Sequence, residues 1–155
     1  MVCLGKNMIP VVWVMVVLAC GRQQRPPAHE GRRILEIPAS SFGLDVGSFL
    51  GTEWALWRVG ALVDTLVLHE PVMSLAVEAR GTPCGRSWPV VECSWNGIRL
   101  GRFEVASSGW AWYRLDHRME PGNGVLRIAL LNDRFSPQGD LNLFVKSVVL
   151  SGEQR

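Results

Sequence analysis

Apolar and polar residues alternate with a period of two through most of this chain after residue 32, and no window of ten or more residues shows clean helical periodicity. In one such segment, Met73, Leu75, Val77 and Ala79 fall on the same face. Successive side chains of a strand point to opposite faces, so the alternation predicts strands with one buried face. Glycine and proline interrupt the pattern often, which predicts short strands joined by turns.

The pattern divides the chain into nine predicted strands. They lie near residues 34–37, 54–59, 62–69, 73–79, 89–95, 98–105, 111–117, 124–131 and 142–150. The clearest hairpin is centred on Asn96-Gly97, because Asn-Gly suits the two positive-φ positions of a type I′ turn. Short strands separated by turns every ~8–12 residues predict an all-β fold, an antiparallel two-sheet β-sandwich of jelly-roll or immunoglobulin type. Residues 33–155 are expected to form this domain.

The composition excludes two classes of protein. Hydrophobic residues make up 48% of the 155 residues and charged residues 19%, which is the opposite of the balance in an intrinsically disordered chain. The formal net charge is +2, without the large excess or dense basic stripe typical of nucleic-acid-binding proteins. We therefore expect no nucleic-acid partner.

The first twenty residues have the features of an export signal. One charged residue, Lys6, precedes an apolar run over residues 8–19. That run is too short to span about 30 Å of hydrocarbon as a helix, and it ends in small residues. Its last four residues, 17–20, read Val-Leu-Ala-Cys and resemble the lipobox of bacterial lipoproteins. A simple cleaved signal peptide with an incidental cysteine is the alternative.

The resemblance to the lipobox implies that residues 1–19 are a lipoprotein signal peptide and that Cys20 is lipidated. Residues 20–32 are polar, contain two prolines and are expected to be a tether. Gly21 after the lipidated cysteine implies sorting to the outer membrane in Gram-negative lipoproteins. The expected location is the bacterial cell envelope, with the lipid anchor as the only membrane contact.

Two cysteines, Cys84 and Cys93, remain after those of the signal and the lipobox. An even remainder in an oxidising compartment favours a disulfide between them. The competing interpretation is a zinc pair. A zinc site needs two more ligands, and no histidine is adjacent in the sequence.

Residues 130–145 contain a candidate metal site. An apolar strand ends in Asn132-Asp133, a loop rich in Gly, Pro and Ser follows, and Asp140-x-Asn142 precedes another apolar strand. Carboxylates and amides at both ends of one tight loop can converge their oxygens, and Ca²⁺ takes about 6–8 oxygen ligands. Asp133 and Asp140 offer charge, and Asn132 or Asn142 offers a neutral oxygen. The alternative is that these side chains only close the turn through bonds to the backbone.

This segment resembles the C-terminal signature of calcium-dependent xylan-binding modules, which are secreted jelly-roll carbohydrate-binding modules. Their pattern is an apolar residue, Asn-Asp, a loop, Asp-Arg-Asn-Leu and a final strand that contains Asp. A weaker resemblance covers about residues 50–152, at segments 54–60, 79–81, 88–89, 110–113 and 121–124. The resemblance implies that protein-bound Ca²⁺ contacts sugar hydroxyls, with Asp133 and Asp140 as metal ligands and Asn142 shaping the loop.

Two residues depart from the family pattern. Leu141 stands where the family has Arg, and Lys146 stands where a final-strand Asp is common. A cation does not ligate Ca²⁺, so Lys146 weakens the case for a second, structural calcium site near Glu36. The two aspartates of the loop match the pattern, and the ligand-associated site remains the expectation.

Trp88, Trp110 and Trp112 are the candidate carbohydrate contacts. Sugars present C–H faces that stack on flat indoles, whose N–H groups also donate hydrogen bonds. Trp110 and Trp112 are two residues apart and are expected to share one sheet face with Arg114, which indicates that part of this face is wet. Core packing is the alternative for each tryptophan. We expect Trp57 and Trp95 to lie in the core or at its rim.

The sequence gives little support for catalysis. It contains no Gly-x-Ser-x-Gly, no His-Glu-x-x-His and no Gly-rich phosphate loop. Asp116-His117 could belong to a catalytic triad, but the sequence identifies no serine to complete it. We expect non-catalytic, calcium-dependent binding of a xylan-like polysaccharide or other glycan by an exported, lipid-anchored module. The alternatives are a structural or protein-interaction envelope lipoprotein that has lost sugar binding, and a small hydrolase.

Overall fold

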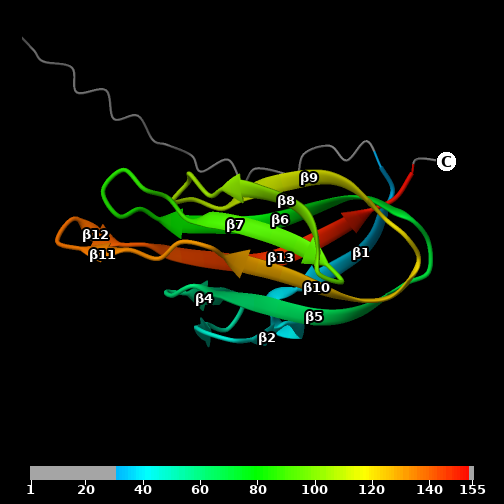
Figure 1. The fold of residues 1–155 in the computed structure, drawn as a ribbon, viewed down its shortest axis with the longest axis horizontal. Helices are drawn as coiled ribbons and strands as arrows, with labels where there is room; N and C mark the ends of the chain where they lie inside the picture. Colours follow the sequence, from blue (N-terminus) through cyan, green and yellow to red (C-terminus); the bar gives the residue numbers. More distant parts are fainter. Residues whose placement is uncertain (1–30, 154–155) are drawn as a thin grey trace, which may run out of the picture.

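The computed structural model describes residues 31–153, which form two antiparallel sheets packed face to face (Figure 1). The longer strands are β1 (Arg33–Pro38), β5 (Gly60–Leu68), β6 (Val72–Thr82), β7 (Val90–Trp95), β8 (Ile98–Glu104), β9 (Ala111–Met119), β10 (Gly122–Leu130) and β13 (Asn142–Ser151). The short elements are η1, a 3₁₀ turn (Ala39–Ser41), and the strands β2 (Gly43–Leu44), β3 (Ser48–Phe49), β4 (Trp54–Leu56), β11 (Phe135–Ser136) and β12 (Gly139–Asp140).

The strand order confirms the predicted antiparallel two-sheet sandwich. The six-stranded sheet runs β3-β4-β13-β6-β9, and β1 also pairs with β13. The five-stranded sheet runs β2-β5-β10-β7-β8, and β11 and β12 form a separate ribbon. Every one of the nine predicted strands is present, although β4 ends at Leu56 and Trp57 beyond it is 39% exposed.

The core lies between the sheets and follows the alternation of the sequence. Leu126, Ile128 and Leu130 of β10 are fully buried, and so is Val77 of β6. Met73 was expected on the same face as Val77 but is only partly buried, because the pairing of β6 with β9 shifts register at this point. Alternation therefore identifies the buried face except where a bulge interrupts it.

The predicted Asn-Gly hairpin joins β7 to β8. Trp95 pairs with Ile98 across the turn, and Asn96 and Gly97 have φ values of 50° and 81°. Both residues are thus in the left-handed region that a type I′ turn requires. Trp95 is 8% exposed, which confirms its expected place in the core.

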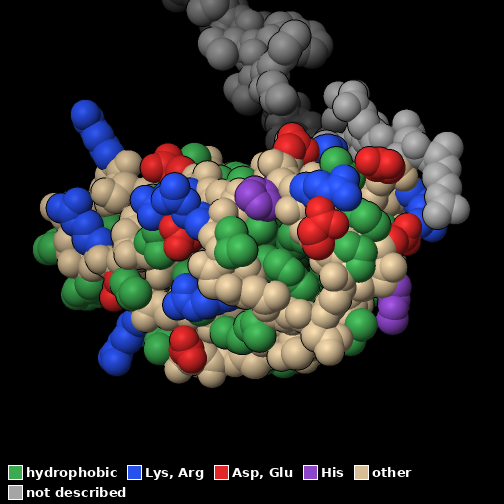
Figure 2. Space-filling model, turned by 45° about the vertical axis from the view of Figure 1, so that its right-hand side comes forward, with side chains coloured by type: hydrophobic (Ala, Val, Ile, Leu, Met, Phe, Trp, Pro, Cys, Tyr) green, Lys and Arg blue, Asp and Glu red, His purple; other side chains and the backbone are tan. Residues whose placement is uncertain are grey.

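Charged side chains of both signs are interspersed over the face shown in Figure 2, without a patch of one sign. This distribution agrees with the small net charge of +2. Among the described residues, no helix is long and apolar enough to cross a membrane. The predicted signal peptide of residues 1–19, the lipidation at Cys20 and nearly all of the tether lie outside the described residues.

The structure corrects the predicted disulfide, because Cys84 and Cys93 are both free thiols buried in the core. Cys93 lies within β7, where its backbone pairs with Gly101 and Ile128. Cys84 lies in the loop before β7, and its Sγ is 3.1 Å from the Oγ of Ser136. Both thiols are thus buried without a cross-link, and the even number of cysteines misled the prediction.

We expect Cys84 and Cys93 to resist alkylation in the native protein and to react after unfolding without any reductant. Both are buried, and burial raises the pKa of Cys93 to about 12, with the Glu92 carboxylate adding to the effect, so its reactive thiolate is scarce at neutral pH. Trypsin places the two cysteines in separate peptides, 81–86 and 87–99. Mass spectrometry of these peptides measures each site, and a cross-linked pair from unreduced protein would contradict the assignment.

Candidate calcium and carbohydrate site

The β11–β12 ribbon projects from one end of the sandwich and connects β10 to β13 (Figure 1). Phe135 pairs with Asp140, and Ser136 pairs with Gly139. The ribbon continues toward the sheets, since the Leu141 N–H donates to the Arg134 carbonyl at 2.9 Å. The loop identified in the sequence is therefore a hairpin with two distinct faces.

One face of the hairpin packs against the loop that precedes β7. The Oγ of Ser136 contacts Cys84 Sγ, and the Nη1 of Arg134 is 3.4 Å from the Oγ of Ser87. A Cβ at Gly139, whose φ is 140°, would lie only 2.9 Å from the carbonyl oxygen of Pro83. This close approach requires glycine, and it holds the hairpin in place from behind.

The other face of the hairpin is open. Phe135 and Asp140 pair directly and so share this side, and alternation continued beyond the two-residue strands would bring Asp133 and Asn142 to it. The amide Nδ2 of Asn142 is 3.3 Å from Oδ2 of Asp140, in agreement with that arrangement. Phe135 is 83% exposed, the most exposed large hydrophobic side chain of the described residues.

Thr82, at the end of β6, fixes the hairpin to the six-stranded sheet. Its hydroxyl donates to the Asp140 carbonyl at 2.7 Å and accepts the backbone N–H of Asn142 at 2.9 Å. It also accepts the Asn142 side-chain amide at 3.1 Å. The sequence analysis did not identify Thr82, because a single threonine at a strand end carries no signal without its cross-strand partner.

Asn132 is a structural residue. Its Oδ1 accepts the Val90 N–H at 2.7 Å, and its Nδ2 donates to the Trp88 carbonyl at 2.9 Å. Both polar ends of the side chain are thus used to tie the end of β10 to the start of β7. Of the two amides considered for the metal site, Asn142 is the one that lies beside an aspartate.

The carboxylates of Asp133 and Asp140 take part in no ion pair with the described residues, although Arg134 is their neighbour in the hairpin. Both are exposed, and within residues 31–153 no group of three or more His, Cys, Asp or Glu side chains is placed to hold a metal. Diagonal neighbours in a regular ribbon have Cα atoms about 7–8 Å apart, which lets two carboxylates reach one ion. The residues fit a Ca²⁺ site in which most ligands are backbone, amide, hydroxyl or solvent oxygens.

Trp110 and Trp112 lie along the outer face of the six-stranded sheet. Trp112 pairs with Glu78, and the guanidinium carbon of Arg80 lies 5.1 Å from the centroid of the Trp110 ring. The same carbon is 3.8 Å from the Phe144 ring, and Lys146 Nζ is 5.7 Å from Trp110. Cations therefore contact the ring of Trp110, one of the three tryptophans that the sequence analysis assigned to sugar.

Two acidic residues hold these cations. Arg80 Nη2 is 2.8 Å from Glu53 Oε1, and Lys146 Nζ is 3.2 Å from Glu78 Oε1. Trp88, the third candidate, is partly buried, with its carbonyl held by Asn132. The structure thus places Asn142 beside Asp140. It places Trp110 and Trp112 on one face of the six-stranded sheet and Trp88 in the loop before β7.

The Asp116-His117 pair does not form a catalytic arrangement. Asp116 is 74% exposed in its side chain and pairs with Arg114 at 2.7 Å. Neighbouring residues of a strand point to opposite faces, so His117 lies on the other side of β9. Nothing in the described residues joins the two side chains.

Comparison with solved structures defines the class of fold. The chain superposes with a TM-score of 0.61 on a CBM36 carbohydrate-binding module in complex with calcium and xylotriose, at 14% identity, covering 76% of this chain and 100% of the other. It superposes with a TM-score of 0.63 on the CBM36-1 domain of a multidomain xylanase from the hindgut metagenome of Trinervitermes trinervoides, at 14% identity and with coverage of 78% and 98%. A β-1,3-glucan-binding CBM6 from Bacillus halodurans gives a TM-score of 0.55, 14% identity and coverage of 79% and 98%.

The fold is therefore the jelly-roll β-sandwich of carbohydrate-binding modules. Residues 74–155 match the family model of CBM60, the Ca-dependent xylan-binding carbohydrate-binding modules, and the chain belongs to this family. Modules of this family bind carbohydrate and are not catalytic, which confirms the prediction of a non-enzyme. A comparison with curated protein sequences gives no match.

Proposed function

We propose that this protein binds a xylan-like polysaccharide through Ca²⁺ held at the open face of the β11–β12 hairpin, and that it does so as an exported, lipid-anchored module. The observation that carries the proposal is the pair of carboxylates, Asp133 and Asp140, free of ion pairs with the described residues and beside the exposed Phe135. Membership of the CBM60 family supports the choice of ligand.

Asp133 and Asp140 hold the ion in this proposal, and Asn142 orients the Asp140 carboxylate through its amide. Thr82 fixes the Asp140 backbone and so keeps the site in shape when no ligand is present. Bound Ca²⁺ supplies positive charge and coordination positions for vicinal sugar hydroxyls. Since only two carboxylates are available, neutral oxygens, including those of the sugar, complete the coordination.

Phe135 provides the stacking surface for a sugar ring. It pairs directly with Asp140, so its ring lies next to the proposed ion. An 83% exposed aromatic ring has no packing role, whereas Trp110 is in contact with Arg80 and Lys146. The aromatic platform is therefore assigned to Phe135 in place of Trp110 and Trp112.

Asp133→Asn and Asp140→Asn should each weaken Ca²⁺ binding at least about tenfold and abolish chelator-sensitive binding of xylohexaose. Each change keeps the side-chain shape and removes one negative charge from the ion. Isothermal titration with Ca²⁺ and with xylohexaose, with and without EDTA, measures both effects. Asp116→Asn, which removes an exposed carboxylate at a distance from the hairpin, is the matched control. Xylohexaose binding unaffected by EDTA would refute the metal role.

Phe135→Ala should weaken xylohexaose binding about tenfold with Ca²⁺ affinity unchanged, because a stacked aromatic ring contributes about 1 kcal/mol or more. Phe135→Leu should lose nearly as much, and Phe135→Trp should retain binding. Val67→Ala, which trims a 55% exposed side chain on β5, is the control for loss of apolar surface. Equal affinities for the Ala variant and the native protein would remove Phe135 from the site.

Cys20→Ala should release the protein from membranes into the soluble fraction of an exporting Gram-negative host. The reason is that lipidation at Cys20 is the only membrane contact in this proposal. Radiolabelled palmitate incorporation and membrane fractionation measure the effect, and Cys3→Ala, within the segment expected to be cleaved, is the control. Lipid label retained by the Cys20→Ala variant would contradict the lipobox assignment.

A structural or protein-interaction role at the cell envelope is the second candidate. Leu141, which stands where the family has Arg, is fully buried. Lys146, which stands where a final-strand Asp is common, forms an ion pair with Glu78. Both side chains are thus unavailable to a ligand at the hairpin. Glycan-array silence of the calcium-loaded protein, together with a reproducible crosslinked protein partner, would favour this role.

A further inference from the structure

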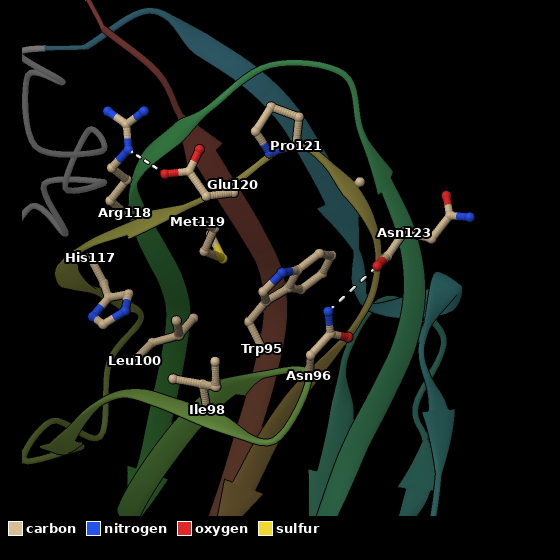
Figure 3. Close-up of a pocket in the computed structure, with 11 residues that line it drawn as sticks. Trp95, Asn96, Ile98, Leu100, His117, Arg118, Met119, Glu120, Pro121 and Asn123 are labelled. Atoms are coloured by element: carbon tan, nitrogen blue, oxygen red, sulfur yellow. Dashed lines mark hydrogen bonds and ion pairs between the residues drawn. The ribbon is translucent and has the colours of Figure 1, made fainter.

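We infer that a cavity at the other end of the sandwich is a second carbohydrate site, which binds one neutral sugar ring without calcium. The cavity lies between the β7–β8 turn and the β9–β10 turn (Figure 3). Strand β10 begins at this cavity with Gly122 and leads from Leu130 toward the β11–β12 hairpin. A strand of nine residues spans about 30 Å, so the two sites do not overlap.

The cavity is small and has an apolar floor. Its volume is about 290 Å³, near the lower end of the range of about 300–1,000 Å³ for small-molecule sites. The apolar side chains that line it are Trp95, Ile98, Leu100, Met119 and Pro121. A space of this size matches a ligand with one ring better than an extended chain.

The indole of Trp95 has an unpaired donor at the cavity. Trp95 is only 8% exposed, and its Nε1–H has no hydrogen-bond acceptor among the described residues. Figure 3 shows the nitrogen edge of the indole turned toward the side of the cavity formed by Met119 and Glu120. Because buried indole N–H groups usually have a partner, this donor points to an acceptor supplied by a ligand.

Gly124 of β10 makes room for this indole. A Cβ at Gly124 would lie 2.1 Å from Cζ2 and 2.4 Å from Cε2 of Trp95. The ring therefore occupies the space that a side chain at position 124 would fill, and this packing holds the edge next to Nε1 against β10. The position of the unpaired donor is thus set by packing.

Further polar groups lie on the same side as the indole nitrogen. His117 makes no hydrogen bond with the described residues, and Glu120 uses Oε1 to accept from Arg118 at 2.7 Å, which leaves Oε2 open. The two charges at the rim are paired with one another, which disfavours a charged ligand. An apolar floor facing donors and acceptors, with the rim charges paired to each other, is suited to a pyranose, whose C–H face is apolar and whose hydroxyls both donate and accept.

The test uses the full chain in EDTA, which silences the calcium site. The probes are the methyl glycosides of xylose, glucose, galactose and mannose, each titrated to about 50 mM, well above a dissociation constant of about 1 mM. The Trp95 indole N–H resonance in ¹⁵N-correlated NMR spectra is the readout. We expect one of these sugars to shift this resonance saturably, with no change in the amides of Asp133 and Asp140.

His117→Ala should weaken this binding about fivefold, the effect of one hydrogen bond, and Ile98→Ala should weaken it to a similar degree. Both residues are partly or largely exposed, so the fold should tolerate the changes. Val67→Ala is the control at an exposed apolar position outside the cavity. Asp140→Asn should bind the methyl glycoside as the native protein does.

Three results would overturn the inference. No shift of the Trp95 indole resonance with any of the four glycosides would remove the sugar assignment. A shift that appears only with Ca²⁺ and disappears in Asp140→Asn would assign the sugar to the hairpin. Binding that His117→Ala and Ile98→Ala leave unchanged would place the sugar outside the cavity.

Discussion

The hydroxyl of Thr82 connects the hairpin to the body of the sandwich, and the geometry of the proposed calcium site depends on it. It satisfies the Asp140 carbonyl and the Asn142 N–H at the point where β12 passes into β13. Without it, two backbone groups at the junction of β12 and β13 would lose this partner, and the hairpin would be held from one side only, by the loop before β7. A site with only two carboxylates cannot rely on charge to hold itself together. The fold must position its oxygens beforehand, and β6 provides that support.

Period-two alternation and turn-forming residues in the sequence were sufficient to predict the main strands and the clearest turn. The sequence located nine of the thirteen strands of the described residues (β1, β4 to β10 and β13), the Asn96-Gly97 turn and the aspartates of the hairpin. It did not reveal the β11–β12 pairing, because two-residue strands carry no periodicity. Phe135 could have been noticed as an aromatic residue in a polar loop, whereas Thr82 and Asn132 act through partners more than forty residues away in sequence. The disulfide prediction failed because a sequence does not distinguish buried free cysteines from disulfide-bonded cysteines.

The outer face of the six-stranded sheet gives Trp110 contacts that the aromatic pattern of the sequence did not reveal. Glu53, Arg80 and Trp110 form a stack of carboxylate, guanidinium and indole, and Lys146 extends it to Glu78. Each group satisfies its neighbour, and two cations lie against the indole of Trp110. The Lys at position 146 belongs to this layer. Its departure from the family pattern is thus explained by packing on this face. The face differs in chemistry from the acidic hairpin, although Lys146 is close to the hairpin in sequence.

The two ends of the sandwich carry groups of a different kind. At one end, the exposed carboxylates of Asp133 and Asp140 have no cationic partner within residues 31–153. At the other, the indole N–H of Trp95, which has no acceptor among the described residues, faces a cavity with an apolar floor. In our proposals, the first arrangement attracts a hard cation, because its carboxylates carry uncompensated charge, and the second a neutral hydroxylated ring, because its indole N–H needs an acceptor. Strand β10 connects the two ends, so a polysaccharide and a separate sugar residue would bind to the same module without competing for the same surface.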